Sequence, residues 1–417
     1  MDTDRNRPTP PTGKLSADAR LTLLLQGLFT FAYVMSGTFL NLYLWRLTED
    51  LWVNGFYNFI VFISTAISFL ISGGFAKRFG KMPVFRIGIG LYTVFYLFVV
   101  AAGTQVVTYY ELFAVFFGIA SGLYWIGFWT LTYEVSNDGN RLRFIGLNSV
   151  VSTAANLTAP LVSAGIFLVM PGLHGYLVIF ALAFLFYLAT ALISHRIRHK
   201  VPSTREKRYY IRHMSIVFRR NKAWRKAVFG NLLFGARQGV QLLLPVLLLY
   251  QTFGEEDRIG LLNAVLSFFS ILASYLFSRF AKEAHIRTCL AGGAVLTTAG
   301  ACLLMTGLSP VTVVGFMLAG AIGNPVIQSS LDGYNYKLIG GLPLRGEMRI
   351  EALVLREVCW NIGRACAMML MVLIADDLSG FRLSAVVVFI MAAQLLLAVF
   401  VEKPARSTTE PAASAAG

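Results

Sequence analysis

Charged residues are scarce in this sequence. Only 14% of its 417 residues are Asp, Glu, Lys or Arg, whereas 56% are hydrophobic. A water-soluble chain of this length needs a larger charged fraction to cover its surface. The composition therefore excludes an ordinary soluble protein, although the length alone would suit two or three soluble domains.

Sequence patterns that carry enzyme chemistry are also missing. No glycine-rich loop ends in Lys followed by Ser or Thr, which excludes an ATP-driven motor in this chain. The five histidines lie in loops or at the ends of apolar segments, without a cluster of other metal ligands. We therefore expect no enzyme activity, no catalytic residues, no metal site and no cofactor.

Cysteine is rare as well, and its spacing matches neither a zinc site nor a disulfide framework. Each cysteine falls inside an apolar segment, where a free thiol behaves as a small packing residue. The four are Cys289, Cys302, Cys359 and Cys366.

What the sequence does contain is a series of long apolar segments. Each is about 20 residues or longer and can cross a hydrocarbon layer roughly 30 Å thick as a helix. They lack the strict alternation of a barrel strand. The predicted spans are 21–44, 53–76, 84–103, 107–133, 144–169, 174–195, 227–252, 259–280, 286–306, 310–332, 352–375 and 381–401. The predicted fold class is an all-α integral membrane protein with twelve transmembrane helices.

The spans divide into two halves of six, and polar segments flank and separate them. The polar ends have the composition of disordered tails. In chain order we predict a tail at 1–20, a first half at 21–195, a basic linker at 196–226, a second half at 227–401 and a tail at 402–417. Similar turns, Lys77–Lys81 and Ser278–Lys282, follow the second helix of each half, which indicates an internal duplication.

The net charge of +15 is distributed unevenly. Thirty of the 36 Lys and Arg residues fall at one side of the predicted bundle, three at the other side and three within spans. In membrane proteins the side rich in Lys and Arg faces the cytoplasm. We therefore expect a multi-pass protein of the cell membrane with both termini in the cytoplasm, and no nucleic-acid partner.

The turn after the second predicted helix carries a recognisable motif. It resembles G-x-x-x-D-[RK]-x-G-[RK], which lies between helices 2 and 3 in the major facilitator superfamily. Gly73, Arg78, Gly80 and Lys81 match this motif. Lys77 stands where the family usually has Asp, a residue that contributes to a charge relay at the cytoplasmic gate. A gate at this place must therefore be built differently.

This resemblance implies the major facilitator fold, with two six-helix pseudo-repeats and a substrate site between them. Two further segments, 133–141 and 356–364, resemble those of a bacterial subgroup that is described as sugar-transporter-like or uncharacterised.

The predicted helix at 144–169 carries a second resemblance, to the motif G-x8-G-x3-G-P-x2-G. In the superfamily this motif is linked to exporters that work as antiporters. The fitting positions are Gly146, Ala155, Ala159, Pro160 and Ser163, with Ala or Ser in place of three glycines. Small side chains on one face let two helices approach closely. The resemblance favours export.

One arginine lies near the middle of a predicted span. An ionisable side chain at this depth is costly unless it is paired or hydrated, so it suggests a function. Arg237 and Gln241 are four residues apart and share a helical face. In the superfamily this helix lines the central cavity, where an arginine could clamp a carboxylate or phosphate of the substrate. A structural ion pair with another helix is the alternative.

The predicted helix at 352–375 contains a second polar stripe. Glu357, Asn361 and Arg364 are spaced four and three residues apart on one face. Glu357 is the one carboxylate well inside a predicted span, and it is our candidate for proton coupling. A polar brace between helices, with Arg364 paired to Glu357, is the alternative.

Further cavity and gate residues follow from position within the predicted spans. For the cavity we predict Tyr33, Asn41, Trp125, Trp129, Asn324 and Gln328. Stacked aromatic side chains suit sugar rings, planar drugs or cations, and packing between helices explains them equally well. At the cytoplasmic ends, Glu134, Arg141 and Asp332 could close an inward gate, or be solvated loop charges.

The basic linker contains Ile211, Met214 and Phe218 at helical spacing among basic residues. This pattern predicts an amphipathic helix that lies on the anionic inner leaflet of the membrane.

Together these features predict a monomeric secondary active transporter that moves a small solute across the cytoplasmic membrane by alternating access. Proton-coupled export and uptake of a sugar-like solute both fit the sequence. A lipid flippase and a membrane receptor that does not transport are the alternatives from other functional classes.

Overall fold

The computed structural model describes residues 15–135, 140–197, 208–280, 285–342, 348–375, 378 and 380–401. Most of both predicted tails lies outside these residues, as do the side chains of Glu134 and Arg141. The described part of the chain is built of helices and contains no strand.

Helices of the first half are α1 (Ala17–Thr48), α2 (Leu51–Phe79), α3 (Lys81–Ala102), α4 (Tyr110–Val135), α5 (Arg141–Val169) and α6 (Leu173–Ser194). They are followed by α7 (Ile211–Arg220), α8 (Lys222–Phe253), α9 (Glu256–Phe280), α10 (Ile286–Leu304), α11 (Pro310–Gly340), α12 (Arg349–Ile374), α13 (Phe381–Ala393) and α14 (Leu397–Phe400). A 3₁₀ turn joins α13 to α14 into one span, so twelve helices of the described chain are long and apolar enough to cross a membrane. The predicted twelve-helix fold is confirmed.

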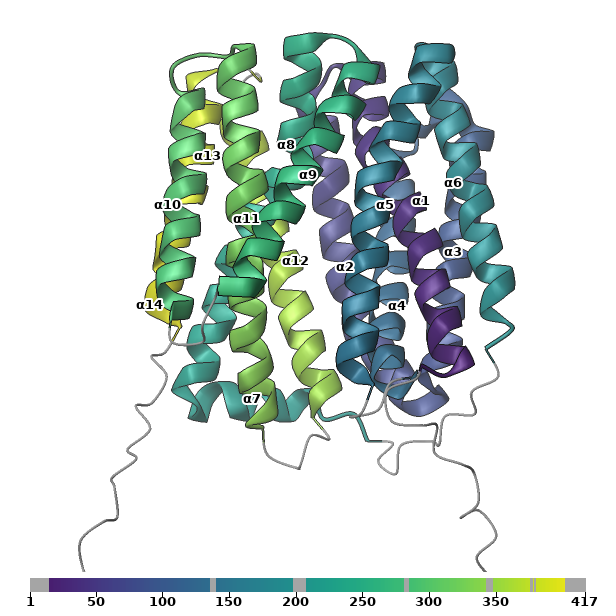
Figure 1. Ribbon diagram of the computed structural model, residues 1–417, viewed down its shortest axis with the longest axis vertical. Coiled ribbons are helices and arrows are strands. Elements are labelled where there is room, and N and C mark those ends of the chain that lie inside the picture. The colour runs from purple at the N-terminus through teal and green to yellow at the C-terminus, as the bar shows by residue number, and fades with distance from the viewer. Residues whose placement is uncertain are drawn as a thin grey trace, which may run out of the picture.

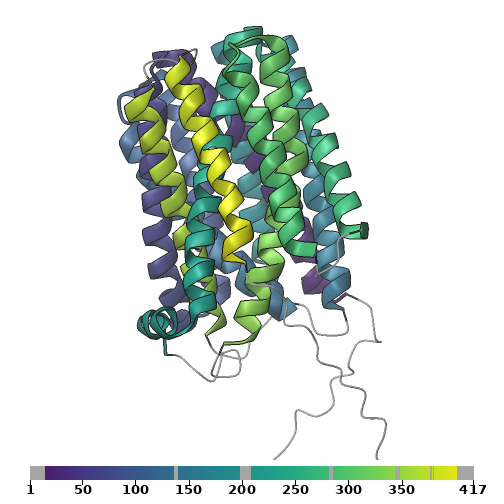
Figure 2. The same ribbon diagram turned by 90° about the vertical axis from the view of Figure 1, so that its left-hand side faces the viewer.

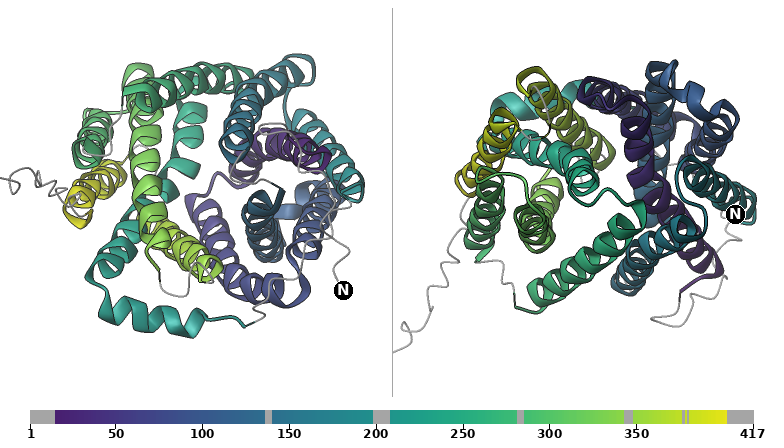
Figure 3. Two further views of the ribbon diagram at one scale, coloured as in Figure 1. Left: turned by 60° about the horizontal axis from the view of Figure 1, so that its bottom comes forward. Right: turned by 90° about the horizontal axis from the view of Figure 1, so that it is seen from above.

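The twelve long helices run side by side in two groups, α1–α6 and α8–α14 (Figure 1). Viewed along the helices, the purple-to-blue group and the teal-to-yellow group lie next to each other (Figure 3). The short helix α7 lies across one end of the bundle (Figure 2), which we call the α7 end. The first residues of α1 and the last residues of α14 are directed toward this same end (Figure 1).

Helices α1 and α8 begin four and five residues earlier than the hydropathy pattern predicts, because polar caps precede them. The Ser16 side chain accepts a hydrogen bond from the backbone nitrogen of Ala19, so α1 begins at Ala17. The Asn221 side chain accepts from the backbone nitrogens of Ala223 and Trp224, so α8 begins at Lys222. Part of the predicted linker is therefore the first turn of α8.

The amphipathic helix predicted in the linker is α7, but protein covers its apolar face. Met214 is only 2% exposed and packs with Trp224, Ile339 and Leu353 at the ends of α8, α11 and α12. Basic residues such as Arg219 and Arg220 stay exposed. The predicted contact with an anionic membrane surface stays a prediction, and it rests on these basic residues rather than on the apolar face.

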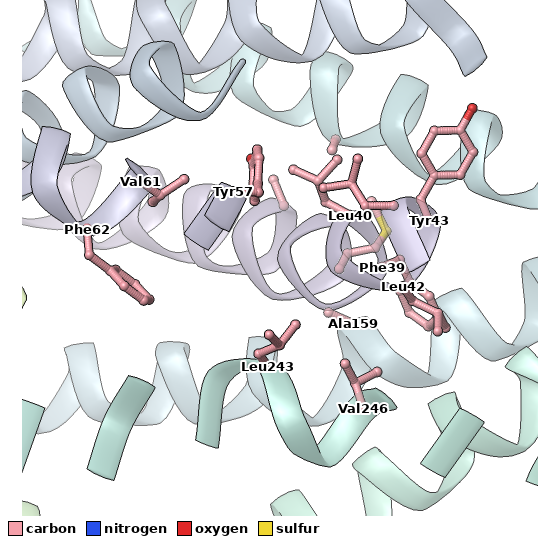
Figure 4. Packing of buried hydrophobic residues seen from close by; sticks show 14 of the residues in the cluster. Phe39, Leu40, Leu42, Tyr43, Tyr57, Val61, Phe62, Ala159, Leu243 and Val246 are labelled. Carbon is pink, nitrogen blue, oxygen red and sulfur yellow. The ribbon is translucent and has the colours of Figure 1, made fainter. Parts of the chain in front are cut away.

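Both halves contribute apolar residues to one core. Leu243 and Val246 of α8 point toward Ala159 of α5 and Phe39 of α1 (Figure 4). Nearby, the place of a Cβ atom on Gly260 of α9 is taken by atoms of α5. Small residues on α5, which the sequence predicts as a packing face, thus allow α5 and α9 of opposite halves to touch.

Within the second half, α8 and α12 approach each other through glycines. A Cβ atom on Gly235 would overlap the backbone of Trp360, and one on Gly363 would overlap the backbone of Leu232. Such close backbone contact is characteristic of helix pairs in membranes.

We expect Gly235→Ala and Gly292→Ala to have opposite effects. At Gly235 the added methyl group must push α8 from α12, so the variant should lose roughly 1–3 kcal/mol of stability. At Gly292 of α10 a Cβ atom meets nothing within 4 Å, and alanine should gain about 0.5–1 kcal/mol from helix propensity. Thermal unfolding of the purified variants in detergent measures both shifts, and shifts of equal sign would contradict the interpretation.

Candidate functional site

A cavity of about 620 Å³ lies between the two halves. Helices α1, α2, α4 and α5 of the first half and α8, α11 and α12 of the second half form its wall. Of the predicted site residues, the lining includes Tyr33, Asn41, Trp125, Trp129, Gln328, Glu357, Asn361 and Arg364. The cavity is thus placed where a solute can contact both halves at once.

The wall from the first half is largely aromatic. The Trp125 and Trp129 rings of α4 stack with centroids 5.9 Å apart, and Tyr33 of α1 meets Trp125 edge-on at 6.2 Å. Asn58 of α2 donates a hydrogen bond to Asn41 of α1 at 2.8 Å. This wall combines ring faces with an amide pair, and it carries no charged side chain among the described lining residues.

The wall from the second half carries charge. The Arg364 guanidinium of α12 donates from Nε and Nη2 to Oε1 of Gln238 on α8, at 3.0 and 2.5 Å. Its Nη1 donates to Asn361 at 3.1 Å. These neutral partners fix the guanidinium at the cavity wall without neutralising it. Gln238 is not among the predicted site residues, although it directly follows Arg237.

Glu357 is paired, but with its neighbour Arg356 rather than with Arg364. The Arg356 guanidinium donates to Glu357 at 2.7 Å and lies 3.4 Å from the carboxylate of Asp332 on α11. Its side chain is 4% exposed and sits over the Trp360 ring. We call Asp332, Arg356 and Glu357 the acidic triad. Two carboxylates share one cation, so the triad carries one negative charge when both are ionised.

Arg237, Gln241 and Asn324 do not line the central cavity. Gln241 and Asn324 face a second, smaller pocket of about 230 Å³ between α8, α9 and α11. Arg237 is 1% exposed, and it donates hydrogen bonds to the side-chain oxygens of both amides. The structure therefore separates these three predicted cavity residues from the other five and from the three predicted coupling residues.

The motif between α2 and α3 forms an ion pair between the halves. Lys77 Nζ lies 2.6 Å from Glu351 at the start of α12, and both side chains are almost fully buried. Glu351 also accepts from the backbone nitrogen of Tyr210 at 2.8 Å, while Lys77 donates to the Arg208 carbonyl at 3.1 Å. The carboxylate that the motif lacks on α2 is thus present on α12. Glu351 is not among the predicted site residues.

Other residues of this motif shape the turn and the contact. Gly80 has a φ of 96°, a conformation that favours glycine, and it ends α2. The place of a Cβ atom on Gly73 is taken by Tyr209 and Val354. Tyr209 donates to the Leu70 carbonyl, and burial together with the negative charge of Glu351 raises the pKa of its hydroxyl. Arg78 is exposed, and its guanidinium lies over the ring of the neighbouring Phe79.

A second ion pair joins the halves at the end opposite α7. Arg46 near the end of α1 lies 3.1 Å from Glu256 at the start of α9. Tyr176 of α6 donates to Glu256 at 3.3 Å, and Tyr250 of α8 accepts from Arg46. The halves are thus joined by charge at both ends of the cavity. Of the predicted gate charges near α4 and α11, Asp332 belongs to the acidic triad, and the side chains of Glu134 and Arg141 lie outside the described residues.

The sequence matches the family model of the Major Facilitator Superfamily over residues 22–341. It is 27% identical over 370 residues to the uncharacterized protein YqgE of Bacillus subtilis (strain 168), covering 87% of this chain and 84% of that protein. It is also 28% identical over 167 residues to an uncharacterized protein from the sodM 3' region of Geobacillus stearothermophilus, covering 40% of this chain and 78% of that protein.

Solved structures share this fold at low sequence identity. A D-xylose-proton symporter superposes with a TM-score of 0.71 at 15% identity, over 92% of this chain and 97% of that one. The nucleoside transporter NupG gives a TM-score of 0.70 at 14% identity, over 92% of this chain and 98% of that one. At 14–15% identity these similarities show the fold alone.

We expect Lys77→Met to destabilise the protein more than Arg78→Met. The first variant leaves the Glu351 carboxylate buried without its cation, which typically costs about 3–5 kcal/mol. Arg78 is exposed, so its loss should cost less than about 1 kcal/mol. Apparent melting temperatures of the purified variants measure the difference.

The double variant Lys77→Met with Glu351→Leu serves as the control for charge. Because it removes both charges, it should recover most of the stability lost in Lys77→Met. Additive losses in the double variant would show that the two residues do not act as a pair.

Proposed function

The chain belongs to the Major Facilitator Superfamily, and on this premise we propose that it exports a small solute across the cytoplasmic membrane in exchange for protons. The observation that carries this proposal is the central cavity, which both halves line and whose wall includes Glu357 of the acidic triad. A cavity between two rigid halves is the arrangement that alternating access requires.

The two cross-half ion pairs support a mechanism in which the halves rock against each other. Lys77–Glu351 lies at the α7 end and Arg46–Glu256 at the opposite end, with the cavity between them. Opening the cavity toward the α7 end requires the first pair to separate, and opening it toward the other side requires the second. In this proposal each pair locks one side while the other side opens, and the α7 end faces the cytoplasm because it carries the basic linker.

The acidic triad supports proton coupling. With both carboxyls ionised, Asp332, Arg356 and Glu357 carry one net negative charge, which faces the positive charge of Arg364 on the same helix as Glu357. Uptake of one proton brings the triad to neutrality. Glu357 lines the cavity, so the proton can enter from there, and bound solute can favour one charge state over the other.

Export is the proposed direction because of α5. Its small residues form the face that touches α9 of the other half, through Gly260. This is the segment that resembles the motif of exporting antiporters. A lipid flippase is less well supported, because amide side chains of both halves and charged side chains of the second half line the cavity.

We expect Glu357→Gln to abolish solute-dependent proton movement. The purified protein is placed in vesicles with an internal pH dye and tested against sugars, organic anions and cationic dyes. Glutamine keeps the shape of Glu357 and removes its proton exchange. The matched control is Glu255→Gln, an exposed glutamate near the end opposite α7 whose ion pair with Arg258 lies on the surface; it should behave like the unaltered protein.

Normal transport with an unchanged pH dependence in Glu357→Gln would rule out the assigned coupling role. If cavity variants alter ligand binding while no solute of the panel ever moves, the receptor alternative is supported instead. Transfer of labelled lipid between leaflets, without movement of soluble solutes, would support the flippase.

A further inference from the structure

A pocket of about 230 Å³ lies between α8, α9 and α11, and the proposed mechanism does not use it. Its polar wall consists of Gln241, Asn324, Asn263, Ser267 and Ser270, and apolar residues such as Phe316 complete it. Asn324 lies one helical turn from Gln328, which lines the central cavity. The pocket therefore adjoins the transport cavity on the side of the second half, and we call it the side pocket.

A buried arginine lies behind the polar wall of the side pocket. Arg237 is 1% exposed, and among the described residues it takes part in no ion pair. Its partners are the amides of Gln241 and Asn324 and the ring of Phe234, 4.7 Å away. Its Nε has no hydrogen-bond partner within the described chain. Burying a guanidinium without a counter-charge is costly, so a ligand that supplies one would be bound strongly.

Arg237 also determines the orientation of the side-chain amides of Gln241 and Asn324. A guanidinium can only donate hydrogen bonds, so the side-chain oxygens of Gln241 and Asn324 must turn toward Arg237. The amide nitrogens then point away from Arg237. Gln241 Nε2 donates to Asn324 at 2.7 Å, and each amide group has further N–H hydrogens to offer. Polarisation by the cation strengthens donors in such a chain. The pocket therefore presents hydrogen-bond donors backed by a positive charge.

We propose that the side pocket binds the carboxylate of the transported solute, so that the substrate class is a small organic anion. This inference rests on the proposed function, since it assigns a substrate class to that transporter. Gln241 and Asn324 contact the carboxylate, together with the hydroxyls of Ser267 and Ser270. Arg237 is a positioning residue that supplies charge through the amides, and the apolar wall accommodates the organic part. The same donors and charge would repel a cationic solute.

The test compares acids with their amides. Benzoate, hexanoate and 2-naphthoate, each with the corresponding neutral amide, are titrated onto the purified full-length protein in detergent, with thermal shift and calorimetry as readouts. We expect at least one acid to bind and to raise the melting temperature, and its amide to do neither. If no acid binds, or if the amide binds as well as its acid, the proposal is overturned.

The variant Asn324→Asp makes the test specific for the side pocket. Its new carboxylate would pair with Arg237 and neutralise the charge within the protein, so acid affinity should fall by roughly tenfold or more. The variant itself should be at least as stable as the unaltered protein, because the buried arginine gains a partner. The matched control is Asn221→Asp, which makes the same change at the cap of α8, where Asp also caps well. Acid binding by Asn324→Asp equal to that of Asn221→Asp would contradict the assignment.

Arg237→Lys and Arg237→Met separate charge from structure. Lysine keeps the charge and should retain the preference for acid over amide at reduced affinity, whereas methionine should lose the preference. A loss of preference in both variants alike would indicate that Arg237 has only a structural role.

Vesicle transport of the same compounds distinguishes the two proposals. If neutral or cationic solutes move and acids neither move nor compete, the transporter proposal stands and the side-pocket proposal fails. If acids bind as expected and no solute moves, the side pocket is a site for organic anions, but the transporter proposal fails and with it the assignment of the acid as transported substrate.

Discussion

The cost of burying charge in an apolar bundle is the constraint on which the rest of this structure depends. A charged side chain at membrane depth that has no partner destabilises the protein by several kcal/mol. Lys77 and Glu351 satisfy this requirement by pairing across the boundary between the halves. Arg356 satisfies it by pairing with Glu357, which lines the cavity. Arg237 satisfies it only with neutral amides. Charge is therefore concentrated where the halves meet and where solute can enter.

Close contacts at glycines occur inside a half and also between the halves, whereas ion pairs join the halves at the two ends of the cavity. Inside the second half, glycines such as Gly235 and Gly363 bring backbones together and leave no room for sliding. Between the halves, the ends of the cavity are joined by single ion pairs, Lys77–Glu351 and Arg46–Glu256. An ion pair can separate when both partners become hydrated, so these two contacts suit halves that move relative to each other.

Several site residues could be predicted because their signal is local. Glu357, Asn361 and Arg364 share one face of a single helix, and the structure places all three at the central cavity. Their partners could not be predicted in the same way. The choice of Arg356 over Arg364 as the partner of Glu357 depends on side-chain direction, and the pairing of Lys77 with Glu351 joins residues 274 positions apart. The missing acidic residue in the motif at Lys77 was a usable signal that a carboxylate had to come from elsewhere.

Hydropathy and the distribution of Lys and Arg, both readable along the chain, determined the twelve spans and the expected orientation. They do so because crossing a membrane imposes a length and an apolar composition on each segment separately. The tertiary structure alone decided which face of each helix meets the cavity. Gln238 and Gln241 are three residues apart on α8, yet Gln238 lines the central cavity and Gln241 lines the side pocket. The rotation of α8 about its own axis decides which residue faces which space. That rotation is set by the contacts of Gly235 and Gly239 with the backbone of α12. The spacing of these glycines can be read in α8, but the helix that they meet cannot.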